Sequence, residues 1–320
     1  MNPHAAERMK DLTDKLKQGA RDVFESDRYA EYLQTVSKFH SYSFRNVILI
    51  LMQYPEASRV AGFNTWKKLG RTVKRGEKGI AILAPITFKK LVETTVYDPD
   101  THAPVYDTNG DPVKETKIVK MPSYKIVHVF DLSQTEGREL PSIGVDELTG
   151  DVSGYDAILN AVTDIAPVPV HFRSGDHISK GCYSHVERCI YINEGMSQVQ
   201  TVKTAIHETA HSILHAVKVE DGKIVEKLGK DQYTREVEAE SIAYVVCQHF
   251  GIDTSDYSFA YVTSWSRSKE LDELTASLEC ISNTAAAIID GIEERCPELR
   301  PPEPEPVEQT PKKRSYSKAI

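Results

Sequence analysis

Two histidines separated by three residues stand in the C-terminal half of this 320-residue chain, in the stretch His207-Glu208-Thr209-Ala210-His211. Residues four apart on an α-helix project from the same face about one turn apart, so both imidazoles can bind one metal ion. Glu208 projects beside them, where its carboxylate can take a proton from a metal-bound water. The pattern predicts a Zn²⁺ site with His207 and His211 as ligands and Glu208 as the general base.

The residues around this motif are those of a helix that packs into a core. The apolar ones are Ala205, Ile206, Ala210, Ile213 and Leu214. Two histidines and a glutamate on such a helix are costly without partners, and a metal ion removes that cost. The alternative is a pair of helix histidines with ordinary hydrogen-bond partners.

The third ligand separates the classes of zinc peptidase. The class with a third histidine requires glycine at position 214 and histidine at position 217, where this chain has Leu214 and Val217. The other class takes a glutamate from a later helix, and Glu236 and Glu240 lie four apart on such a predicted helix. We predict that Glu236 is the ligand and that Glu240 orients one of the histidines. A solvated acidic helix face is the alternative.

Other side chains near the motif are left open by the sequence. Glu238 is expected to point away from the face of Glu236. His215 lies two turns beyond His207 and is a rival ligand, but it is more typical of a surface histidine. A predicted strand over residues 189–192 could bind an extended peptide by strand addition. Four tyrosines are candidates to donate to an oxyanion: Tyr183, Tyr191, Tyr233 and Tyr244.

A basic segment in the N-terminal half indicates a second function. Nine basic residues and one acidic residue, Glu77, lie between Arg59 and Lys90, with aromatic residues among them. Cations hold phosphates and unpaired bases stack on aromatic rings, so this composition suits single-stranded nucleic acid. The predicted contacts are Trp66, Lys67, Lys68, Arg71, Lys74, Arg75 and Lys78. The alternative is a solvated basic face with the aromatics in the core, which we expect above all for Phe63 and Trp66.

Charge and length divide the chain into halves. The net charge is −8, but residues 1–130 carry 21 Lys and Arg against 15 Asp and Glu, whereas residues 131–320 carry 18 against 32. Such asymmetry suggests a different partner for each half. A length of 320 residues also favours two domains over one.

The location expected from the sequence is the cytoplasm. No apolar run is long enough to span a bilayer, and the first residues lack the apolar region of a secretory signal. The five cysteines are odd in number and form no Cys-x-x-Cys pair, which argues against a disulfide framework. No membrane partner is expected.

The pattern of apolar residues, prolines and glycines predicts an α+β protein of two domains. Residues 1–131 form a helical and small-sheet domain, residues 132–154 a linker, residues 155–296 the domain with the histidine pair, and residues 297–320 a disordered tail. The predicted helices are 5–19, 25–39, 44–54, 155–165, 234–250 and 269–294, besides the histidine helix. The predicted strands are 80–88, 124–130, 168–173 and 189–192, with a hairpin tip or exposed loop over 97–116.

Several motifs together resemble the ArdC-type antirestriction proteins. Those of the first half are Tyr42-Ser43-Phe44-Arg45-Asn46, Ala61-Gly62-Phe63-Asn64-Thr65-Trp66, Val73-Lys74-Arg75-Gly76-Glu77-Lys78-Gly79 and Val129-Phe130-Asp131. Those of the second half are the His-Glu-x-x-His stretch, Tyr233-Thr234-Arg235-Glu236 and the Glu-x-x-Ala-Glu of Glu236 to Glu240, which resemble the zincin-like metallopeptidase domain of that family.

The resemblance implies a mobile-element protein whose N-terminal domain binds single-stranded DNA, with Arg45 and Asn46 among the contacts. It would shield incoming conjugative DNA from host restriction. The resemblance also implies that His207, His211 and Glu236 hold the metal and that Glu208 is the base.

Two alternatives remain for the function. One is a DNA-protecting protein whose zinc is mainly structural. The other is a regulatory zinc protease that cleaves a repressor or host protein, with the basic half only recruiting it to DNA. The intact Glu208 favours the interpretations with peptide hydrolysis, because a purely structural zinc does not need a general base.

Overall fold

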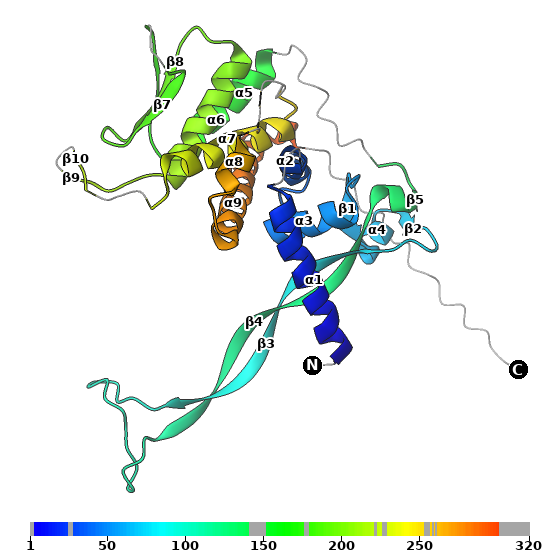
Figure 1. Ribbon diagram of the computed structural model, residues 1–320, viewed down its shortest axis with the longest axis vertical. Helices are drawn as coiled ribbons and strands as arrows, with labels where there is room; N and C mark the ends of the chain where they lie inside the picture. The colour runs from blue at the N-terminus through cyan, green and yellow to red at the C-terminus, as the bar shows by residue number, and fades with distance from the viewer. Residues whose placement is uncertain are drawn as a thin grey trace, which may run out of the picture.

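The computed structural model describes residues 3–24, 28–140, 152–175, 179–220, 223–225, 229–252, 257, 259 and 261–300. It is an α+β structure of two parts that follow the two halves of the sequence (Figure 1). Among the described residues, no helix has both the length and the apolar character that crossing a membrane requires.

The first part opens with three helices close to the predicted ones: α1 (Pro3–Asp22), α2 (Arg28–Lys38) and α3 (Phe44–Gln53). The apolar stripe of α2 is buried as expected, with Tyr29, Tyr32, Leu33 and Val36 at most 1% exposed. Helix α3 ends just before Pro55, whose ring is incompatible with a helix interior.

Three antiparallel strands follow in the order β1-β4-β3. Their bounds are β1 (Val60–Gly62), β3 (Ile80–Thr95) and β4 (Lys114–Asp131), and β1 leads directly into the short helix α4 (Phe63–Lys68). Strand β3 pairs with β4 along its full length, and both strands are much longer than the predicted 80–88 and 124–130. The predicted loop over 97–116 lies at the far end of this hairpin.

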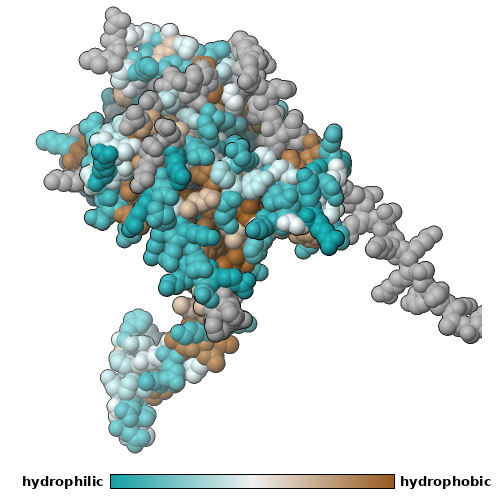
Figure 2. Space-filling model, turned by 45° about the vertical axis from the view of Figure 1, so that its right-hand side comes forward, coloured by the Kyte–Doolittle hydropathy of each residue, from teal (hydrophilic) through white to brown (hydrophobic). Residues whose placement is uncertain are grey.

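The hairpin of β3 and β4 extends away from the rest of the molecule as a two-stranded arm (Figure 1). A hydrophobic patch lies on the arm between the body and the polar tip (Figure 2). Its large apolar side chains are at least 36% exposed: Ile86, Phe88, Leu91, Ile118, Val119, Met121 and Tyr124. A two-stranded ribbon has no second layer to cover such side chains, so both of its faces meet solvent.

The predicted linker starts too early. Residues Leu132–Gln134 form the 3-10 turn η1, and β5 (Thr135–Gly137) pairs with β2 (Arg71–Val73). The carboxylate of Asp131 holds this turn to the loop that precedes β1, because it accepts from the backbone N–H groups of Ser58, Arg59 and Ser133. Residues up to Gly137 therefore belong to the first part, while 141–151 lie outside the described residues.

The second part contains a small sheet in the order β6-β8-β7, with β6 and β8 parallel and β7 antiparallel to β8. Its strands and helices are α5 (Val152–Ile165), β6 (Val170–Arg173), β7 (Gly181–Ser184), β8 (Cys189–Asn193), α6 (Gln198–Leu214), β9 (Val219–Glu220), β10 (Lys223–Ile224), α7 (Gln232–His249), α8 (Val262–Ser266) and α9 (Leu271–Arg295). The predicted tail also starts too early, because Pro297–Leu299 forms the 3-10 turn η2 and Leu299 packs on the core. Residues 301–320 lie outside the described residues.

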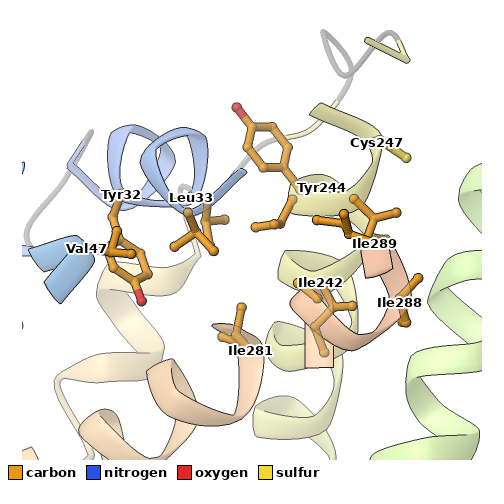
Figure 3. Close-up of a cluster of buried hydrophobic side chains, with 14 of the residues drawn as sticks. Tyr32, Leu33, Val47, Ile242, Tyr244, Cys247, Ile281, Ile288 and Ile289 are labelled. Carbon is orange, nitrogen blue, oxygen red and sulfur yellow. The ribbon is translucent and has the colours of Figure 1, made fainter. Parts of the chain in front are cut away.

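The two parts share one continuous hydrophobic core. Helix α2 packs on α7, and α1 and α3 contact α9. Figure 3 shows Tyr32, Leu33 and Val47 of the first part facing Ile281 and Ile242 of the second. Hydrogen bonds also join the parts, among them Tyr29 to Ser241 at 2.7 Å and Tyr32 to Ser282 at 3.1 Å. The parts are therefore distinct in sequence but are not independent in packing.

Candidate metal centre

The histidine pair and Glu236 come from two helices that pack against each other, α6 and α7. Nε2 of His207 lies 3.0 Å from Nε2 of His211. One carboxylate oxygen of Glu236 lies 3.5 Å from each of these nitrogens. Ligand atoms on a tetrahedral zinc, each about 2.0–2.1 Å from the ion, are separated by roughly 3.3 Å. The three donor atoms are thus spaced so that they could hold one metal ion.

Both helices begin with a side-chain cap that fixes where these residues lie. Ser197 precedes α6 and accepts a hydrogen bond from the backbone N–H of Gln200 at 3.2 Å. Asp231 precedes α7, accepts from the N–H of Thr234 at 2.9 Å and pairs with Lys269 at 2.6 Å. Capping satisfies backbone donors that the first turn of a helix leaves free.

The charges at the three predicted ligands favour cation binding. Hydrogen bonds from His207 and His211 hold the pKa of Glu236 well below its usual range, so this carboxylate is ionised. Burial by itself lowers the pKa of His207, but the carboxylates of Glu236 and Glu240 outweigh it and raise the pKa to about 9. Burial lowers the pKa of His211. Without a metal, the site therefore holds a proton on His207 in the place of a cation.

Glu208 lies beside this trio and is almost fully buried, with 8% of its surface exposed. Burial raises the pKa of its carboxyl, while the backbone N–H of Tyr183 on β7 donates to it and acts in the opposite sense. A raised pKa brings a carboxylate closer to the range in which it can exchange protons near neutral pH.

The approach of β7 to α6 depends on Gly181. A Cβ on this residue would lie 2.6 Å from a methyl carbon of Thr204 and 3.2 Å from Cγ of Glu208. No side chain fits in that space without moving the strand, so glycine keeps the N–H of Tyr183 within reach of Glu208.

Each histidine of the pair has a partner on its other ring nitrogen. Nδ1 of His207 lies 3.4 Å from a carboxylate oxygen of Glu240, the residue predicted to orient a histidine. Nδ1 of His211 lies 2.8 Å from Nδ1 of His215. Groups of this kind fix the orientation of a metal-binding imidazole and its tautomer.

The expectation of a surface position for His215 is wrong. His215 is 2% exposed, and its Nε2 lies 3.2 Å from Glu238, which is fully buried. Glu238 does face away from Glu236, but it also accepts from Lys230 at 2.6 Å and from Ser277 at 2.8 Å. The regular four-residue spacing of His207, His211 and His215 is a sequence signal that could have revealed this buried row.

A cavity of about 620 Å³ opens beside the trio. Of the four candidate tyrosines, Tyr183 lines it, whereas Tyr244 is buried and its hydroxyl accepts from Gln34. Sequence reasoning missed several residues that line the cavity, among them Tyr257, His185, Lys180, Lys203 and Arg235. They lie in loops or on α6 and α7, at positions that are not part of the spacing typical of metal ligands.

The structure overturns two of the predicted DNA contacts. Trp66 is fully buried, and its indole N–H donates to the backbone carbonyl of Phe130 at 2.8 Å. Asn46 is 8% exposed, and its side-chain amide both donates to and accepts from the backbone of Leu83 at 2.9 Å. Both side chains hold the fold together, because a buried polar group needs a partner. Neither one offers a surface to DNA.

The remaining basic residues lie at the surface. Arg45, Lys67, Lys68, Lys74, Arg75 and Lys78 are exposed. Arg71 is half-buried, and its guanidinium bonds to Thr135 and to the carbonyl of Arg138. The expectation that Phe63 is a core residue is wrong, since it is 52% exposed at the start of α4.

Comparison with known families matches both parts. Residues 2–130 match the N-terminal domain of anti-restriction factor ArdC. Residues 166–263 match the M78 peptidase family, described as an IrrE N-terminal-like domain. The chain belongs to the ArdC antirestriction family. Its second part is the peptidase-like domain, and the candidate metal centre lies within it.

Relatives of this ArdC-family chain share modest identity with it. An uncharacterized protein of Bacillus anthracis is 27% identical over 332 residues, which is 92% of this chain and 53% of the relative. DNA primase TraC of Escherichia coli is 29% identical over 236 residues, which is 72% of this chain and 21% of the primase. The chain thus spans about half the length of the first relative and about a fifth of the second.

A solved structure has a similar fold. It is the Mn(II)-bound crystal structure of the antirestriction protein ArdC from plasmid R388, with a TM-score of 0.52 and 18% identity. The match covers 89% of this chain and 99% of that one. At this identity, the likeness concerns the fold alone.

Proposed function

We propose that this chain is a mobile-element antirestriction protein that binds single-stranded DNA through its first part. In this proposal, its second part is a zinc-dependent peptidase with His207, His211 and Glu236 as ligands. The observation that carries the proposal is the spacing of 3.0 to 3.5 Å among the three donor atoms, with Glu208 in the same cavity. We place the protein in the cytoplasm, where cysteines such as its five free ones stay reduced.

A bound Zn²⁺ would polarise a water molecule and the carbonyl of a peptide. Glu208 accepts the proton of the attacking water and later delivers it to the departing amine. Its raised pKa and its position beside the histidines suit both steps. Glu240 orients His207, and His215 orients His211. The crystal structure of ArdC from plasmid R388 is Mn(II)-bound, so manganese is the other ion to test.

The DNA-binding surface we propose consists of exposed cations and exposed aromatic rings. Lys67, Lys68, Lys74, Arg75 and Lys78, with Arg45, would hold phosphates. Phe63 takes over the stacking role first given to Trp66, because its ring is accessible. Phe88 on the arm adds a second exposed ring, with Lys89 and Lys90 next to it in sequence. Relatives named as DNA primases are consistent with a partner of this class.

Replacing Glu208 by Gln tests the peptidase. The amide keeps the size of the side chain but cannot accept the proton, so we expect Glu208→Gln to retain its zinc and lose proteolysis. New protein N-termini in host cells would be compared by mass spectrometry after expression of wild type or variant. Glu279→Gln, an exposed change on α9, is the matched control and should cleave like wild type.

Single-stranded DNA binding and protection from restriction would be measured on the same proteins. Glu208→Gln should bind DNA as wild type does, because Glu208 lies in the other part of the chain. If wild type and Glu208→Gln produced the same new N-termini, Glu208 would not be the general base of peptide hydrolysis. No new N-termini with either would favour a structural role for the metal.

A further inference from the structure

Four titratable side chains meet where helices α2 and α3 of the first part pack on α7 and α9 of the second part. His40 follows α2, His249 ends α7, and Asp290 and Glu293 lie one turn apart on α9. The rings of His40 and His249 are in contact, with their centroids 4.7 Å apart. Between His249 and Glu236, α7 extends for about 20 Å at 1.5 Å per residue, so this cluster is separate from the candidate metal centre.

The imidazole of His40 lacks hydrogen-bond partners in this cluster. Its Nδ1 is enclosed and makes no hydrogen bond to any described residue. Its Nε2 lies 3.6 Å from Oδ1 of Asp290, which is too far for a hydrogen bond. An enclosed imidazole with no partner on either nitrogen is costly, and a bound ion would provide a partner for one of the two.

The second histidine holds Glu293 in place. Nδ1 of His249 lies 2.9 Å from the carbonyl oxygen of Ser37, so this nitrogen must carry a proton. Its Nε2 lies 2.8 Å from Oε1 of Glu293. One oxygen of Glu293 is therefore engaged by His249, which leaves the other for a ligand. A carboxylate that binds a metal ion is commonly held in place by a hydrogen bond from a neighbouring group.

We propose that His40, Asp290 and Glu293 bind a second divalent metal ion, and that His249 positions Glu293 for it. One donor atom from each of the three lies within 4.8 Å of the others. One imidazole and two carboxylates are nitrogen and oxygen donors of the kind that Zn²⁺ and Mn²⁺ accept. The ion links the end of α2 to α9, and so it ties the DNA-binding part to the peptidase-like part.

Metal counting tests this proposal. The full chain and its variants are equilibrated with excess Zn²⁺, and in a second series with Mn²⁺, then freed of unbound ion and measured by mass spectrometry. With at least one of the two metals, we expect two ions per wild-type chain and one per chain of His40→Ala. Asp290→Asn should lose the same ion. Because Asp290 is 70% exposed, this variant should keep its fold even where His40→Ala does not.

Two further variants separate this site from the first one. Glu294→Gln changes an exposed acid on the same helix and should retain both ions. His211→Ala should keep one ion, and His40→Ala combined with His211→Ala should keep none. In the His211→Ala chain, the metal should still raise the melting temperature, since it binds only the folded state. That rise should vanish in the double variant.

The outcomes are distinct. One ion per wild-type chain that His211→Ala removes and His40→Ala does not would overturn the second site while leaving the first. One ion that only His40→Ala and Asp290→Asn remove would support the second site and overturn the first. Unchanged counts in both His40→Ala and Asp290→Asn would show that the cluster is a hydrogen-bonded contact between the two parts and no more.

Discussion

At the level of single residues, the negative charge of the carboxylates in the candidate metal centre requires a positive charge beside it, either a metal ion or a proton. Glu236 is ionised, and the nearby carboxylates raise the pKa of His207 to about 9. His211 lies 3.0 Å from His207, and its own pKa is lowered by burial. One proton thus stands in for the ion in the metal-free protein, and an incoming metal has to displace it.

Metal affinity should therefore depend on pH. Below pH 9 His207 is protonated in the metal-free protein and competes with the ion, whereas above pH 9 it is neutral. The apparent affinity should rise about tenfold per pH unit between pH 7 and 9 and then level off. A chelator competition across this range measures it. Glu240→Gln removes one of the carboxylates that raise the pKa, so its curve should level off at a lower pH. A flat curve between pH 7 and 9 would contradict the displacement of a proton.

At the scale of elements, the first part presents its cations on short elements at the edge of the sheet. Lys67 and Lys68 end α4, while Lys74, Arg75 and Lys78 follow β2 in the turn that leads into β3. Trp66 anchors α4 from beneath through its bond to Phe130. The same short helix thus buries one residue and exposes its neighbours, which is how a basic surface is built over a core.

Charge reversal on these elements tests the DNA surface. Changing Lys67, Lys68, Lys74 and Arg75 to Glu should weaken binding to single-stranded DNA, because four phosphate contacts are lost. The slope of log affinity against log salt should become shallower by about 3, at roughly 0.7 per contact. Filter binding or fluorescence anisotropy over a salt series measures both.

The control for this variant carries the same change in charge on α1 and α2, at Lys10, Lys15, Lys17 and Lys38, which are also exposed. It should lose less affinity than the first variant. Equal loss in the two would mean that net charge alone attracts DNA, and no loss in either would remove the first part as the binding surface.

At the scale of the whole molecule, the shared core joins two parts that match different families. Tyr29 donates to Ser241 across the junction, because the hydroxyl of Ser241 is itself committed to the carbonyl of Val237. Leu33 is fully buried at the same junction (Figure 3). Packing of this kind makes the stability of each part depend on the other.

The two parts should unfold together. The chain has two tryptophans, Trp66 in the first part and Trp265 in the second, so Trp66→Phe and Trp265→Phe each leave one fluorescent probe. With metal removed, both probes should report one midpoint in a denaturant titration. Leu33→Ala should lower the free energy of unfolding by about 2–5 kcal/mol. Both probes should therefore report the same shift of the midpoint to lower denaturant concentration.

The control for this substitution is Leu91→Ala on the arm, which should change neither midpoint because Leu91 is 68% exposed. Separate midpoints for the two probes, or a Leu33→Ala effect confined to Trp66, would show that the parts unfold independently.

The features that depend on local periodicity could be predicted from the order of the residues alone. Residues four apart share a helix face wherever the helix packs, so His207 and His211 had to lie together, and Glu236 had to share a face with Glu240. The apolar stripe of α2 and the end of α3 before Pro55 follow for the same reason. The excess of positive charge in the first half could also be counted without a structure.

Which of these helix faces meet depends on how the elements pack in the folded chain. Whether Glu236 reaches the histidines depends on how α7 packs on α6, and the same packing buries His215 against Glu238. Trp66 and Phe63 lie three apart in one short helix and so share nearly the same face, yet Trp66 is buried against Phe130 whereas Phe63, the first residue of the helix, is exposed. His40 and Glu293 are brought together by contacts between helices far apart in the chain. Burial of these particular side chains depends on contacts between elements far apart in the chain, which their local sequence does not show.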